Sequence, residues 1–357
     1  MIRTSRRIIF YTFLVIFIIF VPAVIFYAQG YGFDWGKRIF VVNGGIYLKS
    51  SPPKAEIYIN DVLRGTTNRF VKRLIPKTYN VKLVKEEYHA WEKNIIVKPG
   101  LVTRTDNIFL VPFNPKILLV ATESEEYANF LEKPYPLDKV TETIQKKSKY
   151  TIFKIENINP DKSGKKLYFL SNNNLYSLDW DKTNPDNSIL SPVLVPNVLN
   201  YVIYKSGIIY LDYFSGKIYE LDTTSLKSTE FFDRVFLSFN QGKWILSKDA
   251  GKLLCIKQNS IEILWLNNIN DESIPRLKGE TEKIDLGQQV VNVLWLPQTD
   301  EHLIVSTDDS ILIVELDNRP PQNIVNFITT ENPEIKYDAN NGTLYFLSQN
   351  RLYRTEL

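Results

Sequence analysis

The stretch that decides the fold of most of this chain is Lys166-Leu-Tyr-Phe-Leu-Ser-Asn-Asn-Asn-Leu-Tyr-Ser-Leu-Asp179. Apolar and polar residues alternate on either side of the asparagines, which predicts two short strands joined by a tight turn. Similar stretches cover residues 208–222, 303–317 and 343–356, and a weaker one covers 244–255. Successive copies lie about 40 residues apart, with one wider gap, and this is the period of a four-stranded propeller blade.

A propeller explains this repeat physically, because one small sheet cannot bury both faces whereas radially stacked sheets bury them against each other. At about 40–45 residues per blade, residues 114–357 hold about six blades, with five to seven allowed. Lys116-Ile-Leu-Leu-Val120 is expected to start the first blade. The last repeat reaches the end of the sequence, so its strands could complete a blade with an early strand. Residues 123–149 fit the repeat poorly and are expected to contain a helix or a long insertion. An array of β-sandwiches is the alternative to a propeller for residues 114–357.

The first thirty residues predict a membrane anchor. No charged residue occurs from Ile8 to Ala28, and Arg3, Arg6 and Arg7 precede this run. A helix of this length spans about 30 Å, the thickness of a bilayer's hydrocarbon core. The run is longer than the apolar region of a signal peptide and lacks a small-x-small cleavage pattern, so an uncleaved anchor is favoured over a cleaved signal or a buried helix. The preceding arginines favour a cytoplasmic N-terminus and an extracytoplasmic bulk, as in a single-pass cell-membrane protein.

The residues that follow the run suit a membrane–water interface. Tyr27, Tyr31 and Trp35 have the amphipathic rings that collect there, while Lys37 and Arg38 lie farther along the chain.

Composition favours an all-β protein. Of the 357 residues, 44% are hydrophobic and 13% aromatic, which allows sizeable cores and favours strands. The net charge of +3 gives no reason to expect a nucleic-acid partner. A single cysteine excludes an internal disulfide. The chain divides into a cytoplasmic tip with a transmembrane anchor (1–30), a linker (31–43), a small β-sandwich (44–113) and a β-propeller (114–357).

The β-sandwich segment shows six or seven short alternating runs separated by turn residues. Its opening, Gly45-Ile-Tyr-Leu-Lys-Ser-Ser-Pro-Pro-Lys-Ala-Glu-Ile-Tyr-Ile-Asn-Asp-Val-Leu-Arg-Gly-Thr-Thr67, and its later Pro76-Lys-Thr-Tyr-Asn-Val-Lys-Leu-Val-Lys-Glu-Glu-Tyr-His-Ala-Trp91 resemble a PEGA domain. The chain departs from the family pattern at Lys54, Asp61, Thr78 and Glu87, which stand at glycine positions, and at Asn68, which stands where proline is usual. The resemblance implies a non-catalytic β module of surface and secreted proteins.

The later segment resembles WD40-like or YVTN-like propellers. The paired Gly-His and Trp-Asp signatures of true WD40 repeats are missing, and Asp179-Trp180 is reversed and isolated.

Motifs that carry chemistry are missing from the sequence. It contains no phosphate-binding glycine loop, HExxH, CxxC or GxSxG. The two histidines, His89 and His302, fall in different segments, so neither segment offers a multi-histidine zinc site. The sequence therefore predicts no catalytic, cofactor-binding or metal-ligating residue, and no cofactor.

Individual candidates each have a simpler structural explanation. Cys255 lies in a strand-like apolar run and is expected to be a buried hydrophobe rather than a nucleophile. His302 is expected at a strand edge, and His89 and Trp91 on a half-buried strand face. The remaining polar groups are attributed to loops, turns and solvated faces: the calcium-like spacing of Asp179, Asp181 and Asn184, the pair Asp308-Asp309, and the basic stretch Lys146, Lys147 and Lys149.

The favoured function is a non-enzymatic, single-pass membrane protein that presents both β modules outside the cytoplasm as an interaction or scaffold platform. Its partners would be the membrane and a protein or an envelope glycan. One alternative is a propeller hydrolase or lyase acting on envelope polysaccharide, which would need convergent loop acids. The other is a periplasmic assembly factor that binds extended peptides.

Overall fold

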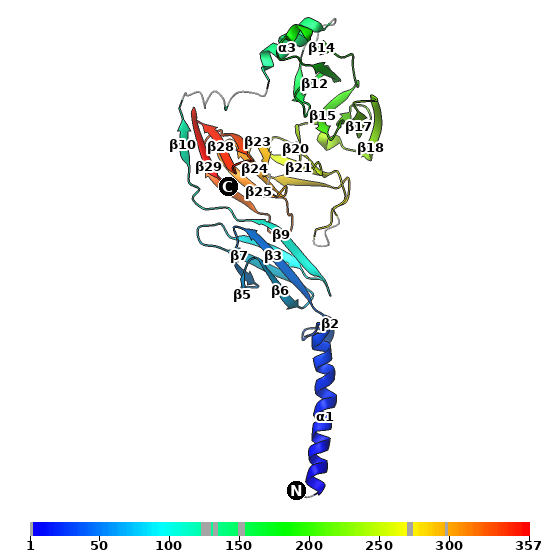
Figure 1. The fold of residues 1–357 in the computed structure, drawn as a ribbon, viewed down its shortest axis with the longest axis vertical. Coiled ribbons are helices and arrows are strands. Elements are labelled where there is room, and N and C mark those ends of the chain that lie inside the picture. The colour runs from blue at the N-terminus through cyan, green and yellow to red at the C-terminus, as the bar shows by residue number, and fades with distance from the viewer. Residues whose placement is uncertain (1–2, 123–129, 131–134, 149–153, 270–273, 297–298) are drawn as a thin grey trace. The chain divides into compact units, whose positions relative to one another are not determined.

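The structure is a computed structural model that describes residues 3–122, 130, 135–148, 154–269, 274–296 and 299–357. The chain forms two compact units (Figure 1). The first contains residues 1–114 together with two short later segments, of which one is Val314–Val325. The second contains most of the remaining chain.

The first unit begins with helix α1 (Arg3–Ala28), which contains Pro22. Its stretch Arg6–Ala28 is long and apolar enough to cross a membrane, and none of this stretch is buried inside the protein. A helix that is apolar all round needs an apolar environment, so the exposed α1 is not the core helix of a soluble domain. A hairpin of β1 (Tyr31–Asp34) and β2 (Ile39–Val42) follows, within the residues expected as a linker.

Seven strands then form the predicted β-sandwich. The three-stranded sheet has the order β6-β3-β9 and the four-stranded sheet the order β5-β4-β7-β8. Their bounds are β3 Gly44–Ser51, β4 Glu56–Ile59, β5 Val62–Thr66, β6 Arg69–Leu74, β7 Thr78–Val84, β8 Trp91–Ile96 and β9 Val102–Phe109. Both sheets contribute fully buried side chains to one core, including Ile46, Leu48, Ile57, Val81 and Leu83.

Alternation and turn chemistry explain this sandwich locally. Along β7, Tyr79, Val81 and Leu83 are buried while the residues between them are partly exposed, as expected for a strand with one face in a core. Asn60 and Asp61 both have positive φ, the backbone conformation of a tight hairpin turn, so the predicted turn is confirmed.

The second unit contains the predicted propeller-type sheets. Within the described residues there are five of these sheets, and each has four strands. The first sheet is β11 (Glu156–Pro160), β12 (Lys166–Ser171), β13 (Asn174–Asp179) and β14 (Ile189–Leu190). The second is β15 (Val198–Tyr204), β16 (Gly207–Asp212), β17 (Lys217–Asp222) and β18 (Lys227–Val235). The third is β19 (Lys243–Leu246), β20 (Lys252–Ile256), β21 (Ser260–Trp265) and β22 (Thr281–Asp285). The fourth is β23 (Val290–Trp295), β24 (His302–Thr307), β25 (Ser310–Glu315) and β26 (Ile324–Thr329). The fifth, in pairing order, is β10 (Leu118–Ala121), β29 (Arg351–Glu356), β28 (Thr343–Ser348) and β27 (Glu334–Asp338). Short 3-10 helices cover Pro185–Asn187 and Leu237–Asn240.

The repeated sequence stretches are the central hairpins of these sheets. Four copies form β12–β13, β16–β17, β24–β25 and β28–β29. The weaker copy forms β19–β20, the first two strands of its sheet rather than the middle two. This different place in the sheet explains its weaker match, because outer and central strands face different neighbours. The blade number of about six stays a prediction.

Consecutive sheets pack face to face, as the repeat predicts. Tyr168 and Leu170 of the first sheet share a buried cluster with Ile208 and Tyr210 of the second. Another cluster joins the second sheet to the third through Ile209 and Leu253, among others. The second sheet therefore buries one face on the first sheet and the other face on the third.

The placement of β10 differs from the expectation that Lys116–Val120 starts the first blade. This strand pairs with β29, the last strand of the described chain, and so completes the fifth sheet. The expectation that the final repeat joins an early strand is thereby confirmed. Pairing with β10 covers the outer edge of β29, so the short β10 rather than β29 is the edge strand of the fifth sheet.

Helix α3 (Leu137–Lys147) lies in the region that fits the repeat poorly, as expected. Its Val140 and Ile144 are fully buried against Leu167 and Phe169 of β12. Because Tyr168 and Leu170 face the second sheet, α3 covers the opposite face of the first sheet. A helix here takes the place that another sheet would occupy in a regular repeat.

Candidate binding sites

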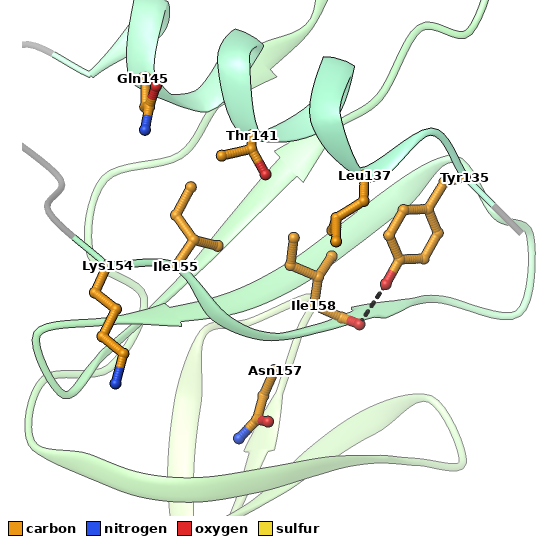
Figure 2. A pocket seen from close by; sticks show the side chains of 8 residues that line it. All are labelled: Tyr135, Leu137, Thr141, Gln145, Lys154, Ile155, Asn157 and Ile158. Carbon is orange, nitrogen blue, oxygen red and sulfur yellow. Dashed lines mark hydrogen bonds between the residues drawn. The ribbon is translucent and has the colours of Figure 1, made fainter. Parts of the chain in front are cut away.

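A pocket of about 450 Å³ lies between α3 and the chain segment that leads into β11 (Figure 2). It is called the seam pocket below, because it lies in the connection between the fifth and the first sheet. Its walls are Tyr135, Leu137, Thr141 and Gln145 on the helix side, and Lys154, Ile155, Asn157 and Ile158 on the strand side. Leu137, Thr141 and Gln145 are four residues apart, so they form one stripe of the helix. Pockets of this volume commonly hold small ligands.

Two tyrosines fix the strand wall of the seam pocket. The Tyr135 hydroxyl donates a hydrogen bond to the Ile158 carbonyl oxygen at 2.6 Å, as Figure 2 shows. The Tyr201 hydroxyl contacts the Asn157 carbonyl oxygen and lies 2.6 Å from the Tyr168 carbonyl oxygen. Burial raises the pKa of both phenols, so they stay protonated and act as structural donors.

The polar side chains of the seam pocket suit binding rather than bond breaking. Lys154 forms an ion pair with Glu156 beside the pocket. Gln145 and Asn157 offer amides and Thr141 a hydroxyl, above apolar Ile155. Among the residues that the structure describes, the lining contains no carboxylate pair and no nucleophile with an adjacent base, the groups on which hydrolysis usually depends.

An exposed apolar cluster forms the second candidate site. It consists of Tyr213, Phe214, Val235 and Leu237 and is called the apolar turn cluster. Phe214 is 78% exposed and Leu237 is 65% exposed, which is unusual for side chains of this size.

The turn that carries this cluster is held by Asp212, whose carboxylate accepts hydrogen bonds from the Phe214 and Ser215 backbone amides. At Gly216, where φ is +62°, an added Cβ would lie 2.9 Å from the Val235 side chain and 3.1 Å from that of Leu237. The turn therefore sits directly on the apolar end of β18.

The remaining sequence candidates are used structurally. Cys255 is fully buried with its thiol 3.1 Å from the Gln241 carbonyl oxygen, and burial raises the pKa of the thiol to about 12. His302 is buried at the start of β24, with Nδ1 3.0 Å from the Thr299 hydroxyl. Neither side chain is presented for chemistry.

The acidic candidates stabilise turns. The Asp181 carboxylate accepts a hydrogen bond from the Thr183 hydroxyl and others from the backbone amides of Asn184 and Thr183, and these bonds lower the pKa of Asp181. Asp179 forms an ion pair with Lys166. The calcium-like spacing therefore forms a loop within the described residues, where no three His, Cys, Asp or Glu side chains gather as a metal ion would require.

The other acidic and basic candidates are likewise engaged locally. Asp309 accepts hydrogen bonds from Thr307 and Gln288 next to the β24–β25 turn. Lys146, in the last turn of α3, forms an exposed ion pair with Asp186. Lys149 lies outside the described residues.

His89 and Trp91 do not share one half-buried strand face. His89 precedes β8 and packs against Phe113, with ring centroids 4.4 Å apart and the ring planes tilted by 57°, and burial lowers the pKa of His89. Trp91 is 3% exposed and belongs to the core.

A buried polar cluster in the first unit is not predicted by any motif in the sequence. The fully buried Lys93 ammonium lies 3.2 Å from the Glu315 carboxylate and 2.5 Å from the Asp317 carbonyl oxygen. The Trp91 indole and the Asn323 amide also donate to Glu315, at 3.0 and 2.7 Å. The alternation of residues along β8 does indicate that Lys93 is buried. Trp91, Lys93 and Ile95 alternate with the other residues of the strand and therefore face the core together.

This cluster fixes the segment Val314–Val325 within the first unit. The Asn94 backbone amide donates to the Pro320 carbonyl oxygen at 2.7 Å, and Arg319 contacts Thr105 of β9 while pairing with Asp317. The Lys93 ammonium and the Glu315 carboxylate are thus engaged by each other and by neighbouring polar groups, so the cluster stabilises the fold.

The described residues thus define an all-β protein with an N-terminal apolar helix, a β-sandwich and propeller-type sheets. Comparison with known families identifies the kind of β-sandwich. Residues 43–109 match the model of the PEGA domain. This segment is a PEGA domain, as its sequence indicates. No curated protein matches the chain.

Solved structures similar to this chain include the β-propeller domain of Cps50 (Swd1) from Myceliophteria thermophila, at 14% identity and a TM-score of 0.37, covering 54% of this chain and 66% of that one. The extracellular domain of the one-component system BT4673 from B. thetaiotaomicron is 11% identical with a TM-score of 0.37, and the match covers 57% of this chain but only 27% of that one. An oligogalacturonate lyase in complex with manganese is 12% identical with a TM-score of 0.37, over 56% of this chain and 64% of that one. At these values the likeness transfers no activity to this chain.

Proposed function

We propose that this chain is a membrane-anchored, non-enzymatic platform that binds a protein partner outside the cytoplasm. Helix α1 would cross the membrane with its N-terminus in the cytoplasm, and the PEGA domain and the propeller would be presented on the other side. The length and apolar character of α1 support the anchor, and the arginines before it support the orientation.

The apolar turn cluster carries the proposal of a protein partner. Large apolar side chains that gather on a surface gain free energy when another apolar surface covers them. Aromatic residues are also enriched among the residues that dominate protein–protein binding. The Tyr213–Phe214 pair, with ring centroids 5.3 Å apart, provides such an anchor.

A photo-reactive amino acid at Phe214 of the full chain, in intact membranes, tests this function. The matched control places it at Leu226, which is 56% exposed at the opposite end of β17. The proposal expects one discrete protein adduct from position 214, none from position 226, and loss of the adduct when Leu237 is replaced by Asp. Equal labelling from both positions, or an adduct that survives Leu237→Asp, would contradict it.

The seam pocket supports an envelope glycan as a second partner class. Its amides, hydroxyl and ammonium group can hydrogen-bond sugar hydroxyls above an apolar floor. In calorimetric titration of the full chain with envelope polysaccharide fragments, Asn157→Ala should weaken binding while Phe214→Ala should not. Turnover of the fragments by the purified protein would instead favour the hydrolase or lyase alternative.

A further inference from the structure

The β1–β2 hairpin packs directly on the end of α1. The Phe26 ring of α1 stacks on Phe40 of β2 with centroids 5.6 Å apart, and meets Tyr31 of β1 edge-on at 5.5 Å. The apolar stretch ends at Ala28, two residues after Phe26. Two residues correspond to about 3 Å along a helix axis. If α1 crosses a bilayer, rings that stack on Phe26 lie at the depth of the bilayer surface.

The hairpin also exposes the side chains that a bilayer surface accepts. Trp35 is 83% exposed, Phe40 is 62% exposed and Ile39 is 48% exposed. The rings of Trp35 and Phe40 both contact Phe33, at 4.8 and 5.1 Å between centroids, so the three aromatic residues form one continuous group. Aromatic residues collect at the headgroup level of membranes, because an apolar ring can be buried while its polar edge stays hydrated.

The turn of the hairpin provides positive charge. Asp34 accepts hydrogen bonds from the Gly36 and Lys37 backbone amides at 2.9 and 3.2 Å, so its carboxylate stabilises the turn. Lys37 and Arg38 follow, and within the described residues neither forms an ion pair. Two cations beside exposed aromatic rings suit the phosphates of lipid headgroups.

The PEGA domain contacts the end of α1 and the residues next to the hairpin. The Arg73 guanidinium of β6 lies 3.8 Å from the centroid of the Tyr27 ring of α1. The Asn43 backbone amide, directly before β3, donates to the Gly30 carbonyl oxygen at 2.9 Å. Contacts on both sides of the hairpin therefore restrict its movement relative to α1 and the PEGA domain.

We infer that the β1–β2 hairpin is a second membrane-binding element, which lies in the headgroup layer of the bilayer that α1 crosses. Trp35, Ile39 and Phe40 insert among the lipids, while Lys37 and Arg38 bind lipid phosphates. Since a single helix can rotate about its axis, this second contact fixes the orientation of the PEGA domain at the membrane surface. The inference rests on the proposed anchoring by α1.

An environment-sensitive fluorophore on the hairpin turn tests this inference. The full chain carries Gly36→Cys in a Cys255→Ala background, is labelled with NBD, and is reconstituted into phosphatidylcholine vesicles with or without phosphatidylglycerol. A Cβ at position 36 has Asp34 Oδ1 as its nearest neighbour, at 3.3 Å, so the site tolerates substitution with a small adjustment. The expected result is blue-shifted NBD emission that headgroup-proximal spin-labelled lipids quench, with stronger quenching when phosphatidylglycerol is present.

Replacing Trp35 and Phe40 by Ser should abolish the shift, and replacing Lys37 and Arg38 by Gln should abolish the effect of phosphatidylglycerol. The matched control replaces Tyr213 and Phe214, an aromatic pair that is also exposed, by Ser and should leave the shift unchanged. Flotation of each variant with the vesicles reports α1 insertion separately. A chain that floats but shows water-like NBD emission would overturn the hairpin inference alone, whereas a chain that fails to float would overturn the anchor as well.

Discussion

The Lys93–Glu315 pair shows how one inward-facing charge can tie distant parts of a chain together. Burial raises the pKa of the Glu315 carboxyl, and the neighbouring Lys93 ammonium opposes that rise. Both groups also have hydrogen-bond partners, which is what makes a buried ion pair tolerable.

Lys93→Met should destabilise the first unit by about 3–5 kcal/mol, because it leaves a buried carboxylate without its counter-charge. Adding Glu315→Gln should restore part of this loss, since a neutral amide still accepts from the Trp91 indole. Hydrogen exchange of the β8 amides measures the local free energy of unfolding. Additive effects of the two substitutions would show that the pair is not coupled.

Cys255 provides a second prediction at this scale. With the pKa of its thiol at about 12 rather than 9.0, the thiolate fraction near pH 8 falls about a thousandfold. Iodoacetamide should therefore label the native chain far more slowly than the denatured chain. The same shift predicts that stability falls as pH rises above 9.0, because the unfolded chain then loses this proton and the folded chain keeps it. Labelling of the native chain at the denatured rate would exclude the buried position of Cys255.

Among the elements, α3 is the one that departs from the repeat. The sequence identified residues 123–149 as irregular but did not show which surface the helix would cover. Its buried side is short, with Val140, Thr143 and Ile144 facing the sheet, so no long amphipathic pattern reveals its partner.

Ile144→Ala should cost about 2–5 kcal/mol of local stability, because it opens a cavity against Leu167 and Phe169. Faster hydrogen exchange in α3 and β12 is the expected readout. Gln145→Ala, one residue farther along the same helix but exposed, should stay within about 0.5 kcal/mol of the parent. Equal effects of the two substitutions would mean that α3 is not packed on the first sheet.

For the whole molecule, the pairing of β10 with β29 joins residues more than two hundred positions apart. A stop codon after Ser348 should remove β29, which lies between β10 and β28, and so leave β10 unpaired and expose the apolar side chains of the fifth sheet. Limited proteolysis should then cut near β10 and β27. Deleting Leu357 alone, which lies beyond β29, is the control and should leave the protease pattern unchanged.

Local patterns in the sequence were sufficient to predict the apolar helix, the small β-sandwich and the repeated hairpins. Periodicity and turn chemistry act between near neighbours, so they can be read from β7 or from the β12–β13 hairpin without knowing what packs on them. Tertiary structure alone decided that β10 completes the fifth sheet, that α3 covers the first, and that Glu315 joins Lys93 in the first unit. Each of these contacts joins residues far apart in the sequence, where burial and charge pairing depend on the assembled fold. The candidate sites belong to this second group: the side chains that form the seam pocket and the apolar turn cluster are unremarkable in sequence, and only folding brings them together.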